Sequence, residues 1–405
     1  MRDFLYFCIH INAFAHMVDN ILFEYMAELL RHTPMDFVRY KADEINWDAR
    51  MVGIVGPRGV GKSTLLLQRI KRSAGGLHLY VSADSFYFSN HTLTSLADDF
   101  AKEGGTHLYI DEVHKYSGWS RELKQIYDTH PSLKVFFTGS SVLDIKRGEA
   151  DLSRRALIYS MQGLSFREYL QLFHHISCRP YTLEEILHHQ VQLPELEHPL
   201  PLFRDYLAHG YYPFALEGDF AQRMLQVVDQ TVEVDIPQYA EMKASTARKL
   251  KRMLSILASL APYKPSMENL ASEIGVSKNS VPDYLLYLER AGMIGMLRDD
   301  TCGMRGLGKI EKVYVDNPSL MAVLTPSPNI GNVRETFFYN QMREKQSVWA
   351  SRVSDFCIGA YTFEVGGRHK GKKQIETVEN AFVVKDDIES GHGIFLPLWH
   401  FGLNY

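Results

Sequence analysis

The sequence predicts an α/β fold with a doubly wound parallel sheet over roughly the first two-fifths of the chain. Short apolar runs, which are typical of strands buried on both faces, recur at residues 51–55, 77–82, 107–110, 135–138 and 157–161. The first run leads into a glycine-rich turn and a helical segment, and the third ends in two adjacent carboxylates. These features favour a parallel sheet with a functional site at the carboxyl ends of its strands.

The composition is that of an ordinary globular protein with several domains. The 405 residues are 45% hydrophobic and 23% charged, which is enough for more than one core. The formal net charge of -4 argues against a chain that coats nucleic acid without specificity, although a local basic face remains compatible with it.

Neither the cysteines nor the histidine pairs indicate a metal site. The pairs His174–His175 and His188–His189 lack acidic or cysteine partners at ligand spacing, so solvated surface is expected. The cysteines share no CxxC spacing, which also argues against a disulfide framework and favours a reducing cytoplasm; they are Cys8, Cys178, Cys302 and Cys357.

The first 23 residues are rich in apolar side chains but do not indicate a membrane segment. Polar residues interrupt the stretch, and it has neither a basic start nor a small-residue cleavage site. We expect an amphipathic helix or a loosely attached extension, and no membrane partner.

The turn after the first strand has the sequence GPRGVGKS, residues 56–63, which is the GxxxxGK[ST] pattern of a P-loop. Its glycines allow successive N–H groups to point inward around phosphates. Lys62 would neutralise the β and γ phosphates of ATP, Ser63 would bind Mg²⁺, and the helix over 64–73 would turn its positive end to the anion. The predicted nucleotide-binding residues are Gly56, Pro57, Arg58, Gly59, Val60, Gly61, Lys62, Ser63 and Thr64.

The two carboxylates that end the third strand complete the predicted site. Asp111 would hold the magnesium ion, and Glu112 would orient and deprotonate the attacking water as a general base. This adjacency is what hydrolysis of ATP requires, whereas the simpler alternative is an acidic cap between a strand and a helix.

Two further segments hold candidates for sensing the γ phosphate. Ser140 and Ser141 follow the strand expected beside the P-loop strand, and a helix cap is the alternative for them. Arg154 or Arg155 could serve as an arginine finger, in the same subunit or a neighbour, because a guanidinium is always charged. Solvated surface charge is an equal alternative for these arginines.

The segments GPRGVGKST, YIDEVHKY, FFTGSS, SRRA and GLSFREYL together resemble a family of prokaryotic AAA-domain ATPases of about this length. More broadly, they are similar to the additional-strand, catalytic-glutamate class of AAA-type P-loop NTPases. The resemblance runs from about Phe37 to the C-terminus. It implies a helical lid, a winged helix and a small α+β domain similar to the restriction-endonuclease-like core. The expected domains are 1–36 (N-terminal helical extension), 37–162 (ATPase), 163–246 (lid), 247–316 (winged helix) and 317–405 (nuclease-like).

The region after the ATPase is expected to be helical and then to form a DNA-binding type of module. Ser165 and Glu168 fit a capping box at a helix start. Residues 267–277 and 278–292 indicate a helix-turn-helix, with 293–297 and 309–315 as a β wing. Its basic residues are offset by acidic ones, so DNA binding and a packing or protein-contact role stay equal alternatives.

The last region departs from the nuclease pattern that the resemblance implies. Glu335 is expected on a helix, and Asp355 and Glu364 on successive strands. The core needs a lysine two residues after its second acid, but Gly366 stands there, and Lys370 would have to substitute from a loop. We therefore expect a nuclease-like fold with weak or absent cleavage.

Taken together, the sequence predicts an ATPase that acts as a nucleotide-driven switch. Its partners would be ATP with magnesium, and DNA or another chain, including a second copy. The alternative is a signalling ATPase whose nucleotide state gates protein partners. A small-molecule kinase finds no support, since Glu112 is placed to serve water and no acceptor pocket is legible.

Overall fold

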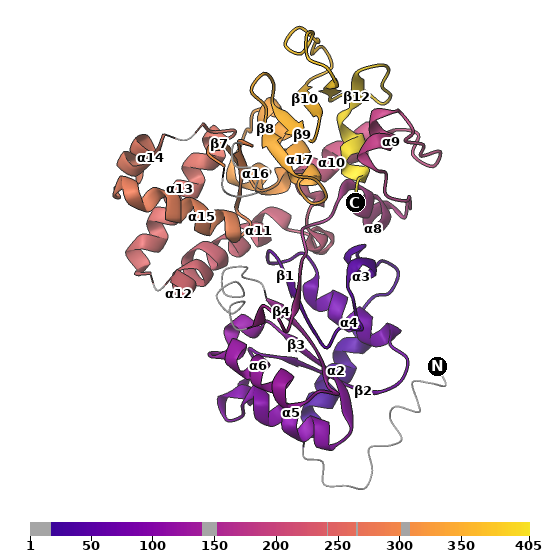
Figure 1. Cartoon of the computed structure of the whole chain (residues 1–405), viewed down its shortest axis with the longest axis vertical. Helices are drawn as coiled ribbons and strands as arrows, with labels where there is room; N and C mark the ends of the chain where they lie inside the picture. Colours follow the sequence, from indigo (N-terminus) through magenta and orange to yellow (C-terminus); the bar gives the residue numbers. More distant parts are fainter. Residues whose placement is uncertain (1–17, 140–151, 241, 265, 301–307) are drawn as a thin grey trace.

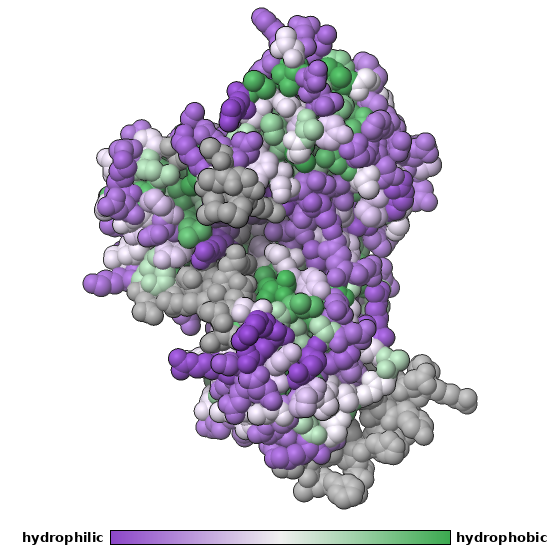
Figure 2. All heavy atoms as spheres, viewed as in Figure 1, coloured by the Kyte–Doolittle hydropathy of each residue, from purple (hydrophilic) through white to green (hydrophobic). Residues whose placement is uncertain are grey.

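The computed structural model describes residues 18–139, 152–240, 242–264, 266–300 and 308–405. The N-terminal sheet domain forms the lower half of the molecule in Figure 1, with a helical region and a second sheet above it. The surface in Figure 2 is mostly hydrophilic, with hydrophobic residues gathered in the upper half and near the junction between the halves. No helix in the described ranges has both the length and the apolar character needed to cross a bilayer.

The N-terminal domain is a five-stranded parallel sheet in the order β2-β3-β4-β1-β5. Its strands are β1 (Met51–Val55), β2 (Leu77–Ser82), β3 (Gly105–Asp111), β4 (Lys134–Gly139) and β5 (Leu157–Ser160). Alternate side chains of β1 join different cores: Val52 and Ile54 pack in one cluster, and Met51 and Val55 pack in the other. Because helices cover both faces of the sheet, the side chains on both faces must be apolar. This requirement explains the continuous apolar runs.

Helices cover both faces of this sheet (Figure 1). They are α2 (Asn20–His32), α3 (Lys41–Glu44), α4 (Lys62–Arg72), α5 (Leu93–Lys102) and α6 (Trp119–Thr129), with short 3₁₀ turns at Phe86–Ser89 and Val113–Lys115. Helix α4 begins two residues earlier than the sequence predicted, since Gly61 adopts a left-handed conformation (φ 94°) that turns the chain into the helix. Helix α2 buries Leu22, Met26 and Leu30.

The region after β5 is helical, as predicted. Its elements are α8 (Phe166–His174), α9 (Leu183–Leu187), α10 (Pro199–Asp205), the π-helical η3 (Tyr206–Gly210), the 3₁₀ η4 (Pro213–Glu217), α11 (Phe220–Asp229), the π-helical η5 (Gln230–Asp235) and α12 (Ile236–Ala240). The capping box of Ser165 and Glu168 is confirmed at the start of α8. Tyr211 and Tyr212 are fully buried, so the aromatic turn between η3 and η4 packs inward.

Three helices and a two-stranded ribbon follow, and the last two helices and the ribbon come in the order that the sequence predicts. They are α13 (Ala244–Leu260), α14 (Met267–Ile274), a 3₁₀ turn at Lys278–Ser280, α15 (Val281–Arg290), β6 (Ile294–Arg298) and β7 (Ile310–Val315). Strands β6 and β7 pair antiparallel, and Gly275 ends α14 in a left-handed conformation. We call residues 244–315 the helix–ribbon unit.

The last region is a second five-stranded sheet in the order β12-β11-β10-β9-β8, with antiparallel β8, β9 and β10 and parallel β10, β11 and β12. Its elements are α16 (Pro318–Leu324), α17 (Ile330–Met342), β8 (Val348–Ala350), β9 (Phe356–Ile358), β10 (Tyr361–Gly366), β11 (Ala381–Lys385), β12 (Phe395–Pro397) and the 3₁₀ segment Leu398–Leu403. Glu335 and Glu364 lie on a helix and a strand as expected, whereas Asp355 directly precedes β9 and does not lie on a strand.

Candidate functional site

The loop between β1 and α4 has the backbone of a phosphate cradle. Gly59 (φ 78°) and Gly61 (φ 94°) lie in the left-handed region, where a side chain would be strained. A Cβ at Gly56 would stand 2.1 Å from the carbonyl oxygen of Met161, so only glycine fits there. The three glycines of the motif are therefore required by the curl of the loop and by its packing.

The Lys62 side chain is buried and folds back over this loop. Its Nζ donates to the carbonyl oxygens of Gly56 (3.0 Å) and Pro57 (2.7 Å). Burial lowers the pKa of Lys62 to about 8, although the negative charges of Glu112 and Asp111 favour its charged form. The ammonium thus lies between the loop and the acidic strand end, where a β or γ phosphate would meet it.

Asp111 ends β3 as a buried carboxylate with two hydroxyl partners. The Tyr80 hydroxyl donates to its Oδ2 at 2.7 Å, and the Thr138 hydroxyl donates to its Oδ1. Tyr80 comes from β2 and Thr138 from β4, so both neighbouring strands orient Asp111. Sequence reasoning missed these two residues, although Thr138 is a polar residue directly after the apolar run 135–137 of its strand.

Glu112 leaves the strand in a left-handed conformation (φ 53°, ψ 41°), which is rare for a residue with a side chain and common at functional sites. Its N–H donates to the Thr138 hydroxyl at 3.0 Å. Its Oε2 lies 3.4 Å from His114 Nε2 and 3.9 Å from Arg58 Nη1. Burial lowers the pKa of His114 to about 3, so the imidazole is neutral near pH 7.

The donor set fits a magnesium-bound nucleotide. The left-handed glycines shape an anion cradle at the N-terminus of α4, and Lys62 supplies a positive charge. Ser63 on the first turn of α4 and Asp111 on β3 are hard oxygen ligands of the kind that Mg²⁺ prefers. Of the other predicted residues, Val60 is buried and Thr64 is exposed.

Of the remaining catalytic candidates, those that the structure describes lie away from this cradle. Ser140 and Ser141 lie outside the described residues. Arg154 and Arg155 precede the amino end of β5, where Leu157 pairs with Val52 of the parallel β1. The P-loop follows the opposite end of β1, so neither arginine is placed to contact phosphates in its own subunit.

Arg155 instead has an exposed partner on α6. It forms paired hydrogen bonds of 2.9 Å with Asp128, and Arg154 is exposed on the same turn. The prediction that one of these arginines acts as an arginine finger in a neighbouring subunit stays open.

Two later regions of the chain contact the loop directly. A Cβ on Gly59 would stand 2.6 Å from the Phe214 ring, and one on Gly292 would stand 2.7 Å from Pro57. Arg58 donates to both carboxylate oxygens of Asp235, at 2.7 and 3.1 Å. Because Phe214 and Asp235 belong to the helical region and Gly292 to the helix–ribbon unit, the phosphate loop lies where the three parts meet.

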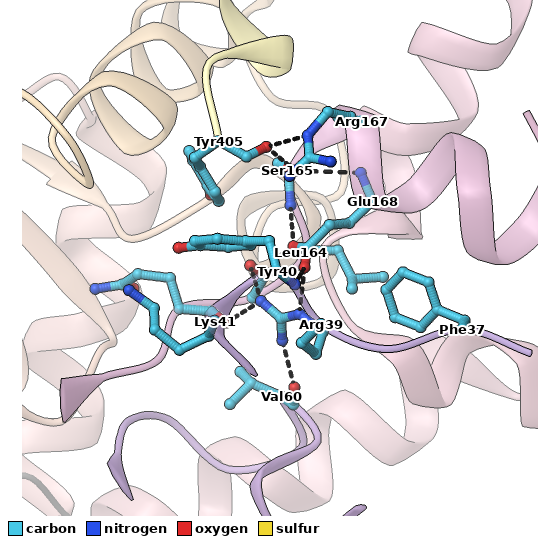
Figure 3. A network of polar contacts seen from close by, with 12 residues as sticks. Phe37, Arg39, Tyr40, Lys41, Val60, Leu164, Ser165, Arg167, Glu168 and Tyr405 are labelled. Atoms are coloured by element: carbon cyan, nitrogen blue, oxygen red, sulfur yellow. Dashed lines mark hydrogen bonds and ion pairs between the residues drawn. The ribbon is translucent and has the colours of Figure 1, made fainter. Parts of the chain in front are cut away.

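A buried polar network holds the other side of the loop (Figure 3). The Arg39 guanidinium donates to the carbonyl oxygen of Val60 (2.6 Å) and to those of Gln162 (2.7 Å) and Gly163 (2.9 Å). It also pairs with Glu168 at 2.8 Å, and both side chains are almost fully buried. The P-loop is thus fixed to the start of the helical region.

The same network reaches the second sheet region. Tyr40 and Lys41, which follow Arg39, each donate to Glu344 at 2.8 Å. A main-chain oxygen of Tyr405 accepts from Ser165 (2.9 Å) and Arg167 (2.8 Å), as Figure 3 shows.

The three predicted carboxylates of the last region pair with two different lysines. Lys312 bridges Glu335 (2.9 Å) and Asp355 (3.1 Å), whereas Glu364 pairs with Lys370. A Cβ at Gly366 would meet the Lys370 side chain at 2.7 Å, so this loop lysine lies over the position where the nuclease pattern expects one. Within the described ranges, no group of three or more acidic, histidine or cysteine residues is arranged to hold a metal ion.

Comparisons with known proteins agree with the geometry of the first domain. Residues 48–170 match the model of a family described as an AAA domain, and residues 200–329 match the model of a domain of unknown function. An uncharacterized protein of Methanocaldococcus jannaschii is 26% identical over 332 residues, which cover 72% of this chain and 69% of the relative.

Similar solved structures are more distant. A Walker-type ATPase of Pyrococcus abyssi shares 14% identity at a TM-score of 0.43, covering 73% of this chain and 99% of that chain. The Hsp104–ADP complex of S. cerevisiae shares 16% identity at a TM-score of 0.30, covering 66% and 40%. The family match and the site together show that this protein contains an AAA-type, P-loop ATPase-like domain.

Proposed function

We propose that this protein binds and hydrolyses ATP and uses the nucleotide state as a switch on its helical and C-terminal parts. The observation that carries the proposal is the meeting of three groups at one loop. Lys62 lies in the phosphate cradle, Asp111 and Glu112 face it, and Arg58 is held by Asp235 of the helical region. An anion bound in the cradle would therefore affect both the hydrolysis reaction and the contacts between the P-loop and the helical region.

The residues support an in-line hydrolysis. Bound Mg²⁺, held by Ser63 and Asp111, would neutralise charge on the phosphates. Glu112 would accept a proton from water as the water oxygen bonds to the γ phosphorus. The bond to the β–γ bridging oxygen breaks, and ADP and phosphate leave. The left-handed backbone of Glu112 and its N–H bond to Thr138 hold this carboxylate toward the cradle.

The test of hydrolysis is the variant Glu112→Gln. We expect it to bind ATP like the unmodified chain and to lose roughly 10²- to 10⁴-fold in turnover, which is the usual contribution of a general base. Glu24→Gln, the same change at an exposed position of α2, is the matched control. Normal turnover by Glu112→Gln would show that the general base is a different group.

The helix–ribbon unit is the proposed contact with DNA, as a winged helix. Two helices joined by a turn at Gly275, followed by an antiparallel ribbon, support this proposal. The exposed Arg248 and Arg252 on α13 are available for phosphates.

A protein partner is the second candidate, and the ion pairs of the same unit favour it. Lys278 pairs with Glu268, Arg298 pairs with Glu289, and Lys251 pairs with acidic residues of the helical region. ATP turnover measured with and without duplex and branched DNA separates the two candidates. Stimulation by DNA supports the first, and turnover that is indifferent to DNA supports the second.

The last region is proposed to be nuclease-like with weak or absent cleavage. The separate ion pairs of Glu335 and Glu364 support this, because a cleavage site needs its carboxylates on one metal ion. Magnesium-dependent nicking of a DNA substrate that is lost in Glu364→Ala would contradict it.

A further inference from the structure

The side chain of Asp235 joins the helical region to the phosphate site. It accepts two hydrogen bonds from Arg58, at 2.7 and 3.1 Å, and one from Lys115 at 3.2 Å. Arg58 belongs to the P-loop and Lys115 follows the acidic end of β3. A single carboxylate of the helical region therefore engages a cation on each side of the cradle.

This contact is strong and shielded. The Asp235 side chain is 3% exposed, against 22% for Arg58 and 17% for Lys115. Burial would raise the pKa of Asp235, but the hydrogen bond and charge of Arg58, with the charge of Lys115, lower it below its ordinary value. A two-pronged bond between a guanidinium and a carboxylate is among the strongest side-chain contacts.

Arg58 also links this contact to the proposed site of hydrolysis. Its Nη1 lies 3.9 Å from Glu112, the proposed general base, while its Nε and Nη2 donate to Asp235. A change in the Arg58–Asp235 contact would therefore change the surroundings of Glu112.

A triphosphate would compete with Asp235 for these cations. The β and γ phosphates bound at Lys62 bring several negative charges next to Arg58, which lies four residues earlier in the same loop. A carboxylate at this place is repelled by the phosphates, and the guanidinium suits either anion. The Nε and Nη2 groups of Arg58 cannot donate the same hydrogen atoms to a phosphate and to Asp235 at once. Phosphate binding therefore favours release of Asp235.

The backbone at Asp235 is of a kind that can rearrange. Asp235 ends η5, a π-helical segment between α11 and α12. π-Helical turns are rare and are frequently found at functional sites. The Phe214 ring against Gly59 comes from the same helical region, so both contacts would move together.

We propose that Asp235 is a nucleotide-responsive latch, which holds the helical region on the P-loop through Arg58 and Lys115 and is displaced when a nucleoside triphosphate takes over these cations. The inference rests on the proposed ATP binding and adds its means of control. It assigns Asp235 a positioning role and not a catalytic one.

The test is ATP binding by Asp235→Asn, measured calorimetrically in magnesium buffer. Removing a competing charged contact should tighten binding about tenfold. Glu233→Gln is the matched control, since Glu233 lies in the same π-helical segment but pairs with Lys251 on the far side, and it should leave the affinity unchanged.

Hydrogen exchange of residues 220–240 separates a latch from a merely structural contact. In the unmodified chain, ATP should speed exchange there, and in Asp235→Asn exchange should be fast already. If Asp235→Asn binds ATP no tighter than Glu233→Gln, or if ATP slows exchange in this segment, there is no latch. A chain that binds no ATP in any form would instead overturn the proposed function itself.

Discussion

Two arginine–carboxylate pairs tie the phosphate loop to the rest of the chain, and they differ in what surrounds them. Arg39 and Glu168 are 4% and 1% exposed, and every described donor of Arg39 goes to Glu168 or to a backbone carbonyl. Arg58 is 22% exposed and faces the cradle, where phosphates would offer it other acceptors. The first pair is a fixed anchor, and the second is a contact that a ligand can replace.

This difference explains how one loop can be held rigidly on one side and still change its contacts on the other when a ligand binds. Burial works against the charge of Arg39, yet the charge and hydrogen bond of Glu168 raise its pKa above the ordinary value. Taking either partner away would leave a buried charge alone, which is costly. At Arg58 the exchange of one anion for another keeps the guanidinium paired, and the displaced Asp235 would move with the helical region toward solvent.

The largest expected effect is the loss of the anchor. Arg39→Ala leaves Glu168 buried without its cation and leaves the carbonyl of Val60 without a donor, so we expect a loss of about 3–5 kcal/mol in the free energy of unfolding. Urea denaturation followed by fluorescence measures it. Arg155→Ala, which breaks an exposed pair, is the control and should hardly move the midpoint. Equal midpoints for the two variants would contradict the anchor.

A smaller effect is expected from pH on ATP binding at the cradle. The pKa of Lys62 is about 8, below its ordinary 10.5, so in the free chain the ammonium is lost as pH rises through 8. Because phosphates need the charged form, ATP affinity should fall about tenfold per pH unit above 8. The dissociation constant at pH 7.5, 8.5 and 9.5 measures this, and an affinity that stays flat to pH 9.5 would show that Lys62 remains charged.

The same shift has the opposite sign for stability. Between pH 8 and 10.5 the unfolded chain holds a proton on Lys62 that the folded chain has lost. The unfolded state then binds more protons, so this group makes the free energy of unfolding rise with pH in that window. Weaker ATP binding above pH 8 should therefore come without unfolding, and circular dichroism at each pH is the control.

The smallest expected effect is at Thr138. Thr138→Val removes the hydroxyl that donates to Asp111 and accepts from the Glu112 N–H, without changing the shape of the side chain. We expect turnover to fall about five- to tenfold with ATP affinity almost unchanged, and Thr138→Ser to restore it. If the valine variant turns over ATP at the normal rate, this hydroxyl does not position the acidic pair.

Much of the first domain could be predicted from the sequence, because its determinants are local. The apolar runs, the glycines of the P-loop and the Asp111–Glu112 pair lie in short contiguous segments, and the structure places them together. The order of α14, α15 and the ribbon β6–β7 could be predicted for the same reason.

The latch could not be predicted, since Asp235 is 177 residues from Arg58 and no local pattern marks either as a partner. The placement of Arg154 and Arg155 was also beyond the sequence, because it depends on which end of β5 the turn precedes. The left-handed backbone of Glu112 gave no signal either, as glutamate is seldom found in that conformation.

The central claim is that the loop around Lys62 binds a magnesium-complexed nucleotide. Calorimetric titration of the purified chain with ATP in magnesium buffer tests it most directly, with Lys62→Ala measured beside it. We predict saturable binding at one site per chain and none in the variant. No heat of binding with any adenine or guanine nucleotide, or equal binding by Lys62→Ala, would contradict the claim.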